Sequence, residues 1–322
     1  MQFLIRGLTR FIPRSGRAHV PDGGPAAQSR GQHGKASKSI LLESSMYLYR
    51  YRKRPNFGDE LNDYLWPRFI QAPMEIEPGS DDVLVGIGTL LNERLPALGR
   101  LHILGTGYGY GRLPTPDAMR RAKVHFVRGP LTAKALGINP ALAISDPGIL
   151  LHRTEDIDRK KDIDCAFMPH HSMHSDRMTS LCEKAGVHFV DPEAPCETVI
   201  DQIGRSRRLI CSAMHGAITA EALRVPWMPV ITNHEILENK WHDWAMSMQT
   251  DIHFRKLPTI WGHTQPSLRG RLASRLKASA FSRMLARMAT SAHFQLGPDA
   301  ILEERLRHIE EKLEAFNSHY SD

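Results

Sequence analysis

An α/β fold with two parallel sheets is predicted by three features of the sequence. Short apolar runs of four to seven residues, typical of buried strands, alternate with segments of helical periodicity between residues 46 and 264. Each run ends in Gly, Arg or Asp-Pro, as strands do when they lead into functional loops. One charged stretch, residues 152–162, interrupts the alternation. This pattern predicts two sets of parallel strands with helices on both faces.

The first domain is expected over residues 46–151. Its strand candidates are Met46–Tyr51, Asp82–Gly86, Leu101–Gly105, Val124–Val127 and Leu142–Ser145. One helix is expected from Asp59 to Ile70. A second, Pro130–Leu136, has the Pro of a first helical turn and stops at Gly137, a good start and stop pair. Residues 152–162 are expected to link this domain to the next.

The second domain is expected over residues 163–264. Its strand candidates are Ile163–Met168, Val187–Val190, Arg208–Ser212 and Trp227–Val230, and its helix candidates are Arg177–Ala185, Pro195–Gly204 and Gly216–Leu223. Two Rossmann-like domains facing each other across a cleft form a bilobal, glycosyltransferase-B-like architecture. Residues 265–322 are expected to be a helical C-terminal extension.

Basic residues concentrate at the two ends of the chain. The formal net charge is +7, and such a surplus attracts anions of many kinds. Residues 1–45 lack hydrophobic periodicity, which predicts a disordered basic tail. The helical pattern Leu268–Met288 carries apolar residues and Arg at helical spacing, so it either packs against the first domain or lies on an anionic membrane surface. No recognised nucleic-acid-binding motif is present, so nucleic acid is not an expected partner.

A cytoplasmic location is expected. The four cysteines show no CxxC spacing and form no disulfide framework, which indicates a reducing compartment. No run of about 18 apolar residues could span a bilayer. The N-terminal apolar run is too short for a secretory signal. Peripheral association with the inner face of the cell membrane stays open.

Two glycine-rich turns follow strands of the first domain. The turn Gly86-Ile87-Gly88 is one, and the other contains Gly107 within Gly105–Gly111. Glycines there let the backbone approach a ligand and direct N–H groups at an anion. Neither turn fits the GxGxxG dinucleotide pattern, and taken alone each favours a tight strand-to-loop connection over a ligand cradle.

Arg128 ends a strand candidate directly before the helix that starts at Pro130. That position points into the crevice where open α/β sheets bind ligands. The forked guanidinium suits a carboxylate or a phosphate. The alternative is an Arg paired with an acid such as Asp146.

His215 is the sharpest candidate for a catalytic residue. A buried strand ends at Ser212, and His215 lies in the turn that opens a helix of small residues. Gly216 and Ala217 leave room for a ligand, and a helix N-terminus favours anions. Histidine exchanges protons readily near neutral pH. A structural histidine at a turn is the alternative.

Three more histidines, His170, His171 and His174, follow another strand candidate. No Asp, Glu or Cys stands at a matching metal-ligand spacing, so no metal site is expected and His170 is a candidate for substrate contact. A plain loop is the alternative. The aromatic pair Trp241 and Trp244 could stack on a sugar ring or pack in the core.

The sequence resembles the polysaccharide pyruvyl transferase family, in particular its exopolysaccharide pyruvyl-ketal branch. The similar segments run in order from residue 46 to residue 244, and they are Asn56–Asn62, Gly86–Gly88, Val127–Thr132, Ser145–Pro147, Met168–His170 and Ser212–Ala217. The resemblance implies two Rossmann-like domains, phosphoenolpyruvate as donor, and no required metal or redox cofactor.

The resemblance also implies roles for individual residues. It makes His215 the catalytic histidine and Arg128 a donor-binding arginine, and it places Asp59 and Asn62 among the substrate-binding residues. The sequence departs from the family at Ala213, where many members carry Arg two residues before the histidine. An anion ligand is then expected from Arg128, Arg205 or His170.

The expected activity is transfer of the pyruvyl group of phosphoenolpyruvate to a sugar of a polysaccharide or lipid-linked oligosaccharide precursor. A pyruvate ketal would form and phosphate would leave. The alternative is a sugar-nucleotide-dependent glycosyltransferase of the same bilobal fold, because fold alone does not decide chemistry.

Overall fold

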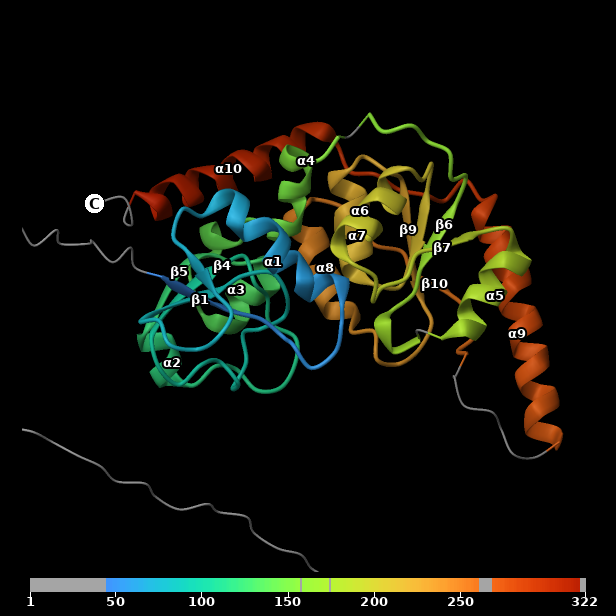
Figure 1. Cartoon of the computed structure of the whole chain (residues 1–322), viewed down its shortest axis with the longest axis horizontal. Coiled ribbons are helices and arrows are strands. Elements are labelled where there is room, and N and C mark those ends of the chain that lie inside the picture. The colour runs from blue at the N-terminus through green and yellow to red at the C-terminus, as the bar shows by residue number, and fades with distance from the viewer. Residues whose placement is uncertain (1–44, 157, 174, 261–267, 319–322) are drawn as a thin grey trace, which may run out of the picture. The chain divides into compact units, whose positions relative to one another are not determined.

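The computed structural model describes residues 45–156, 158–173, 175–260 and 268–318, which belong to one compact unit. Apart from Ser45, the predicted tail of residues 1–45 lies outside the described residues. The structure is α/β, with two parallel five-stranded sheets (Figure 1). We call the parts that carry these sheets the first and second lobes.

The first sheet has the strand order β2-β1-β3-β4-β5. Its strands are β1 (Met46–Tyr49), β2 (Met74–Glu75), β3 (Asp82–Val85), β4 (Arg100–Leu104) and β5 (Ala122–Phe126). Every residue of β3 is buried, and β4 is buried from its second residue onward. Central parallel strands carry apolar side chains on both faces because helices and loops cover both.

The helices of the first lobe begin and end at local signals. They are α1 (Phe57–Phe69), α2 (Pro116–Arg120), α3 (Pro130–Leu136) and α4 (Leu151–Thr154). The side chain of Thr115 caps α2 by accepting from the N–H of Ala118. Helix α3 has the predicted bounds and ends at Gly137, whose φ of 64° is left-handed.

The predicted strand Leu142–Ser145 is wrong. Two short 3₁₀ turns, Pro140–Leu142 and Pro147–Leu150, flank this segment, and only Ala143 forms a bridge, to Val127. The side chains of Asn139 and Asp146 cap the two turns. Asx-Pro pairs start turns because the side chain accepts a nearby N–H while Pro fixes φ.

The second sheet has the strand order β10-β9-β8-β6-β7. Its strands are β6 (Ala166–Met168), β7 (His188–Phe189), β8 (Leu209–Cys211), β9 (Trp227–Ile231) and β10 (Arg255–Lys256), and its helices are α5 (Asp176–Ala185), α6 (Cys196–Gly204), α7 (Met214–Ala222) and α8 (Glu238–Ser247). The predicted strands and helices of this lobe are all found. Three of the four strands are shorter than predicted, whereas β9 extends one residue further, to Ile231.

A continuous apolar cluster joins the two lobes. It contains Trp66 of α1 together with Met168 and Ala217 of the second lobe. The rings of Trp227 and Trp244 pack 5.5 Å apart between centroids, and Trp241 and Trp244 are buried. Of the two alternatives for these tryptophans, core packing is therefore confirmed and the sugar-stacking platform is wrong.

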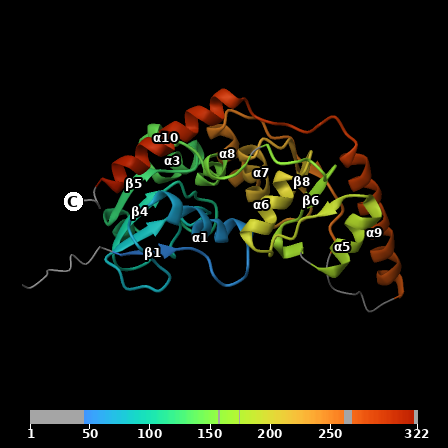
Figure 2. The same cartoon turned by 45° about the horizontal axis from the view of Figure 1, so that its top comes forward.

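Two further helices follow the second sheet. Helix α9 (Leu268–Ala289) lies along α5, so its expected packing against the first domain is wrong (Figure 1). Helix α10 (Asp299–Asn317) returns to the first lobe (Figure 2). There the ring of Phe316 packs with its centroid 5.1 Å from that of His125. No helix within the described ranges is long and apolar enough to cross a membrane.

Candidate active site

A cavity of about 690 Å³ lies where the carboxyl ends of strands from both sheets meet. Its lining residues follow β1, β3, β4, β6, β8 and β9. They are Tyr49, Tyr51, Asn56, Gly58, Asp59, Gly88, Thr89, Leu90, Asn92, Arg94, Tyr110, Gly111, Met168, His170, His171, Ala213, Met214, His215, Glu235, Leu237 and Lys240. Open α/β sheets bind ligands beyond the carboxyl ends of their strands, so this cavity is the candidate active site.

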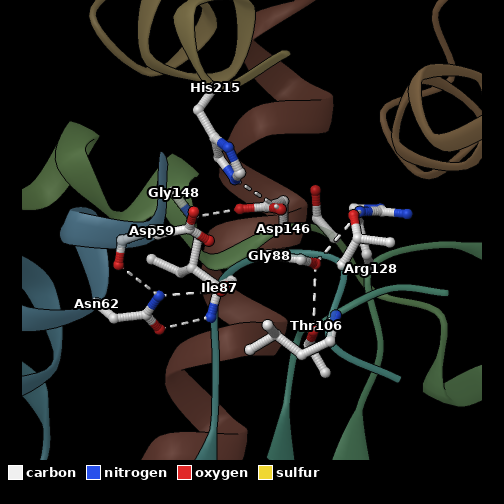
Figure 3. Close-up of polar contacts among 12 residues, drawn as sticks. Asp59, Asn62, Ile87, Gly88, Thr106, Arg128, Asp146, Gly148 and His215 are labelled. Carbon is white, nitrogen blue, oxygen red and sulfur yellow. Dashed lines mark hydrogen bonds and ion pairs between the residues drawn. The ribbon is translucent and has the colours of Figure 1, made fainter. Parts of the chain in front are cut away.

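His215 reaches from the second lobe toward the first. It lies in the first turn of α7, whose N-terminus carries no side-chain cap. Its Nε2 is buried and lies 3.6 Å from Oδ2 of Asp146, a fully buried carboxylate (Figure 3). The other ring nitrogen, Nδ1, lies beside Gly58 of α1, where a Cβ would approach it to 2.0 Å. Because Nε2 faces Asp146, Nδ1 is the candidate nitrogen for proton exchange.

Asp59 occupies the first-lobe side of the same cavity. Burial raises the pKa of its carboxyl, while a hydrogen bond from Asn56 and the charges of His215 and His171 oppose that rise. The Asn56 Nδ2 to Asp59 Oδ2 distance is 2.5 Å. A desolvated carboxyl beside histidines is a common arrangement in acid–base sites.

His170 and His171 line the second-lobe side of the cavity. Their ring centroids lie 4.2 Å apart. Burial lowers the pKa of His170 to about 3, and burial also lowers the pKa of His171. Both rings are therefore neutral near pH 7 and can serve as hydrogen-bonding groups. The backbone N–H of His170 donates to Oγ of Ser212 at 2.8 Å, so Ser212 supports this loop from behind.

Arg128 lies outside the cavity lining. Its side chain is fully buried and pairs with Asp243 of α8, with 3.1 Å between Nε and Oδ2. The remaining nitrogens donate to the carbonyls of Gly88 and Tyr108 and to Oγ1 of Thr89. The arginine is paired with an acid, but the acid is Asp243 and not Asp146. In this geometry the guanidinium of Arg128 links α8 to loops that line the cavity, and its expected binding of the donor stays a prediction.

Asn62 holds the first glycine-rich turn. Its amide donates to the carbonyl of Ile87 and accepts from the N–H of Ile87, at 2.9 and 2.8 Å (Figure 3). Its Oδ1 also accepts from the indole of Trp66. Gly86 lies against the same groups, since a Cβ there would approach Trp66 Nε1 to 2.2 Å. Both residues thus position the turn without lining the cavity.

The other glycines divide between lining and packing. Gly88 lines the cavity with a φ of 130°, and its carbonyl accepts from Thr106 and Arg128 (Figure 3). Gly107 leaves room for the guanidinium of Arg128, and Gly216 leaves room for the sulfur of Met168. Among the residues expected to contact substrate, Asp59, Gly88, His170 and His215 therefore lie in the cavity lining.

Three residues that shape the site were not expected in their observed places. Asp146 lies in a segment of the resemblance, but the sequence suggested it only as an acid that could pair with Arg128. Lys240 lines the cavity and Asp243 anchors Arg128, yet both lie in a segment whose tryptophans dominate its pattern. No local signal distinguishes these two charges from solvent-exposed ones.

Arg205 does not replace the arginine that many family members carry at the position of Ala213. Its guanidinium pairs with Asp162 and Asp201 at the protein surface. The cationic groups that line the cavity are Arg94 and Lys240. No group of three or more His, Cys, Asp or Glu side chains in the described parts of the chain is placed to hold a metal ion. His174 lies outside the described residues.

Comparison with known proteins identifies the family of this chain. The succinoglycan biosynthesis protein ExoV of Rhizobium meliloti (strain 1021) is 36% identical over 206 residues, which cover 63% of this chain and 65% of that protein. The match thus spans less than two thirds of the relative's length. The family model described as polysaccharide pyruvyl transferase matches residues 25–235, a range that includes β1 to β9 and His215. The chain belongs to the polysaccharide pyruvyl transferase family.

Proposed function

We propose that this protein transfers the pyruvyl group of phosphoenolpyruvate to a sugar of a lipid-linked polysaccharide precursor, forms a cyclic pyruvate ketal and releases phosphate. The reaction takes place in the cytoplasm, at the inner face of the cell membrane. The two lobes act as the halves of a glycosyltransferase-B-like enzyme, with the donor bound between them. Family membership and the shape of the cavity support this proposal.

The observation that carries the proposal is the N-terminus of α7 at His215. Helix α7 opens at Met214 without a side-chain cap, whereas the first N–H of α1, that of Phe57, already donates to the carbonyl of Pro192. Free N–H groups at a helix N-terminus bind anions, and the helix dipole adds to the attraction. Lys240 supplies a cation on the same cavity wall. Such a cradle suits a small, highly charged donor such as phosphoenolpyruvate.

The chemistry requires one proton carrier close to the donor. Protonated His215 gives a proton to C3 of phosphoenolpyruvate, which becomes a methyl group, and C2 becomes oxocarbenium-like. A sugar hydroxyl attacks C2, and its proton returns to the imidazole. A second hydroxyl of the same sugar then attacks C2 as the bond to the phosphate oxygen breaks, and its proton leaves with the phosphate. Asp146 orients the imidazole and balances its charge, as a carboxylate behind a catalytic histidine does.

Substitution of the proton carrier tests the proposal. His215→Ala should lower phosphate release from phosphoenolpyruvate, measured with a lipid-linked oligosaccharide acceptor, by about two to four orders of magnitude. His253→Ala is the matched control, because His253 is exposed and does not line the cavity. Wild-type turnover in His215→Ala would contradict the proposal. Release of a nucleoside diphosphate from a sugar nucleotide, without activity on phosphoenolpyruvate, would instead identify a glycosyltransferase.

A further inference from the structure

Helix α9 presents two different faces, although its apolar residues form one series in the sequence. Phe281 and Leu285 are buried against the second lobe, whereas Leu272 and Leu276 are 60% and 63% exposed. At 100° per residue, Phe281 lies about 180° around the helix axis from Leu272. The two exposed leucines are therefore not the end of the buried stripe but belong to an outward face.

Basic side chains share this outward face. Arg283 and Arg287 lie within about 60° of Leu272 around the helix axis, and both are exposed. Arg275 is exposed as well and lies one residue from Leu276. Exposed leucines flanked by arginines are typical of helices that lie in a membrane interface, with the apolar side chains inserted and the cations at the headgroups.

A basic groove runs beside this face, between α5 and α9. It has a volume of about 660 Å³, and its lining residues are Arg177, Ser180, Leu181, Lys184, Arg275, Ala278, Ser279, Ser282, Arg283 and Ala286. Four of these residues are cationic and none is acidic. The sequence contains no Asp or Glu between Asp251 and Asp299, so α9 carries no acid that could neutralise them.

Specific contacts fix the groove. Nη2 of Arg177 donates to the carbonyl of Ser274 at 2.9 Å, and Oγ of Ser282 donates to the carbonyl of Leu181 at 2.9 Å. These bonds join α5 to α9 at two levels (Figure 1). The four cations are thus held close together by fixed helices. Their positive charges repel one another, and an anion bound among them would reduce this repulsion.

We propose that the α5–α9 surface, defined by Arg177, Lys184, Arg275 and Arg283 with Leu272 and Leu276, is the site that docks this protein on an anionic lipid bilayer. Lipid phosphates occupy the basic groove, and the two leucines insert among the acyl chains. This inference deepens the proposed function, because a lipid-linked acceptor has to be met at a membrane.

The path of the chain connects this surface to the active site. His171 lines the cavity, and Arg177 follows it by six residues, a stretch that spans at most about 20 Å. A bilayer docked on α5 and α9 would therefore lie within reach of an oligosaccharide that extends from its lipid into the cavity.

Vesicle sedimentation of the full chain tests the docking surface without requiring any catalysis. The wild-type protein should sediment with phosphatidylcholine vesicles that contain phosphatidylglycerol, should not sediment with pure phosphatidylcholine vesicles, and should dissociate at high salt. Arg275→Glu with Arg283→Glu should lower the partition coefficient at least about tenfold, since each basic residue contributes to attraction by anionic lipid. Leu272→Ser with Leu276→Ser should lower it severalfold at unchanged net charge.

The matched control reverses two exposed charges elsewhere. Arg120→Glu with Lys134→Glu changes the net charge equally but on the first lobe, and it should keep wild-type binding to within about twofold. Binding lost equally in this control would overturn the proposal, because net charge alone would then govern binding. Full binding by the Arg275/Arg283 variant would overturn it as well, and so would a dimer in sedimentation velocity that the leucine substitutions dissociate.

The test of membrane docking can fail or succeed independently of the test of the proposed transferase activity. The docking variants alter no residue of the cavity, so they should release phosphate from phosphoenolpyruvate at the wild-type rate with a detergent-solubilised acceptor. Vesicle binding by His215→Ala should equal that of the wild type.

Discussion

The carboxylate of Asp146 lies 3.6 Å from the imidazole of His215, measured from Oδ2 to Nε2. Asp146 belongs to the turn that follows the first sheet, and His215 opens α7 of the second lobe. The second oxygen of Asp146 accepts from the N–H of Gly148 at 2.9 Å, which fixes the carboxylate. The carboxylate and the candidate proton carrier therefore face each other across the boundary between the lobes.

Asp146→Asn should lower kcat at least about tenfold, because the amide keeps the acceptor for Gly148 but loses the charge that balances the imidazolium. The KM for phosphoenolpyruvate should change much less. The measurement is steady-state phosphate release as a function of pH, and the pH–rate profile should shift. A profile identical to that of the wild type would make Asp146 a structural residue only.

Gly107→Ala should destabilise the protein through Arg128. A Cβ at Gly107 would lie 2.2 Å from the guanidinium, which has to leave its pairing with Asp243. Breaking a buried ion pair costs about 3–5 kcal/mol, and urea denaturation measures the loss. Gly79→Ala is the control, because a Cβ there meets nothing within 4 Å. Equal stability of the two variants would mean that Arg128 tolerates displacement from its buried site.

Acidification should destabilise the protein through His170. Burial lowers its pKa to about 3 in the folded chain, against about 6.5 when unfolded. The unfolded chain therefore binds a proton that the folded chain excludes. The contribution of neutral His170 to the free energy of unfolding is fully present above about pH 6.5. It is lost as the pH falls toward 3, by at most about 1.4 kcal/mol per pH unit. Between pH 7.5 and pH 5, His170→Gln should lose less free energy of unfolding than the wild type, as measured by urea denaturation. An equal loss in the two proteins would exclude His170 as the source of the acid sensitivity.

Local signals in the sequence predicted most of the fold. Helix α3 has its predicted bounds because Pro130 and Gly137 act through their own backbone angles. The predicted strand at Leu142–Ser145 is wrong although local signals were present. The pairs Asn139-Pro140 and Asp146-Pro147 both favour turns, and they flank a short apolar run with one β-branched residue, Ile144.

Contacts between residues far apart in the chain could not be predicted from the sequence. Arg128 was expected near an acid or an anion, but its partner Asp243 is 115 residues away, and only the packing of α8 on α3 selects it. The two faces of α9 could have been predicted in part. At 100° per residue, the spacing of Leu272 and Phe281 places the two side chains on opposite sides of the helix, and only the packing against α5 shows which side is buried.

Gly58→Ala should lower activity without lowering stability. Alanine is favoured over glycine inside a helix by about 1 kcal/mol, so α1 itself should gain from the change. The added Cβ would lie 2.0 Å from Nδ1 of His215, however, and the imidazole has to move. Displacement of a catalytic group by about 1 Å can lower the rate about a hundredfold. The kcat for phosphate release should therefore fall by roughly one to two orders of magnitude.

Two comparisons separate this effect from simple misfolding. Gly79→Ala should keep wild-type kcat, because its Cβ meets open space. In a His215→Ala background the clash is absent, so adding Gly58→Ala should leave the midpoint of thermal unfolding equal to or above that of His215→Ala alone. Wild-type kcat in Gly58→Ala would show that the position of the imidazole beside α1 is not needed for turnover, and the assignment of Nδ1 as the proton-exchanging atom would then be wrong.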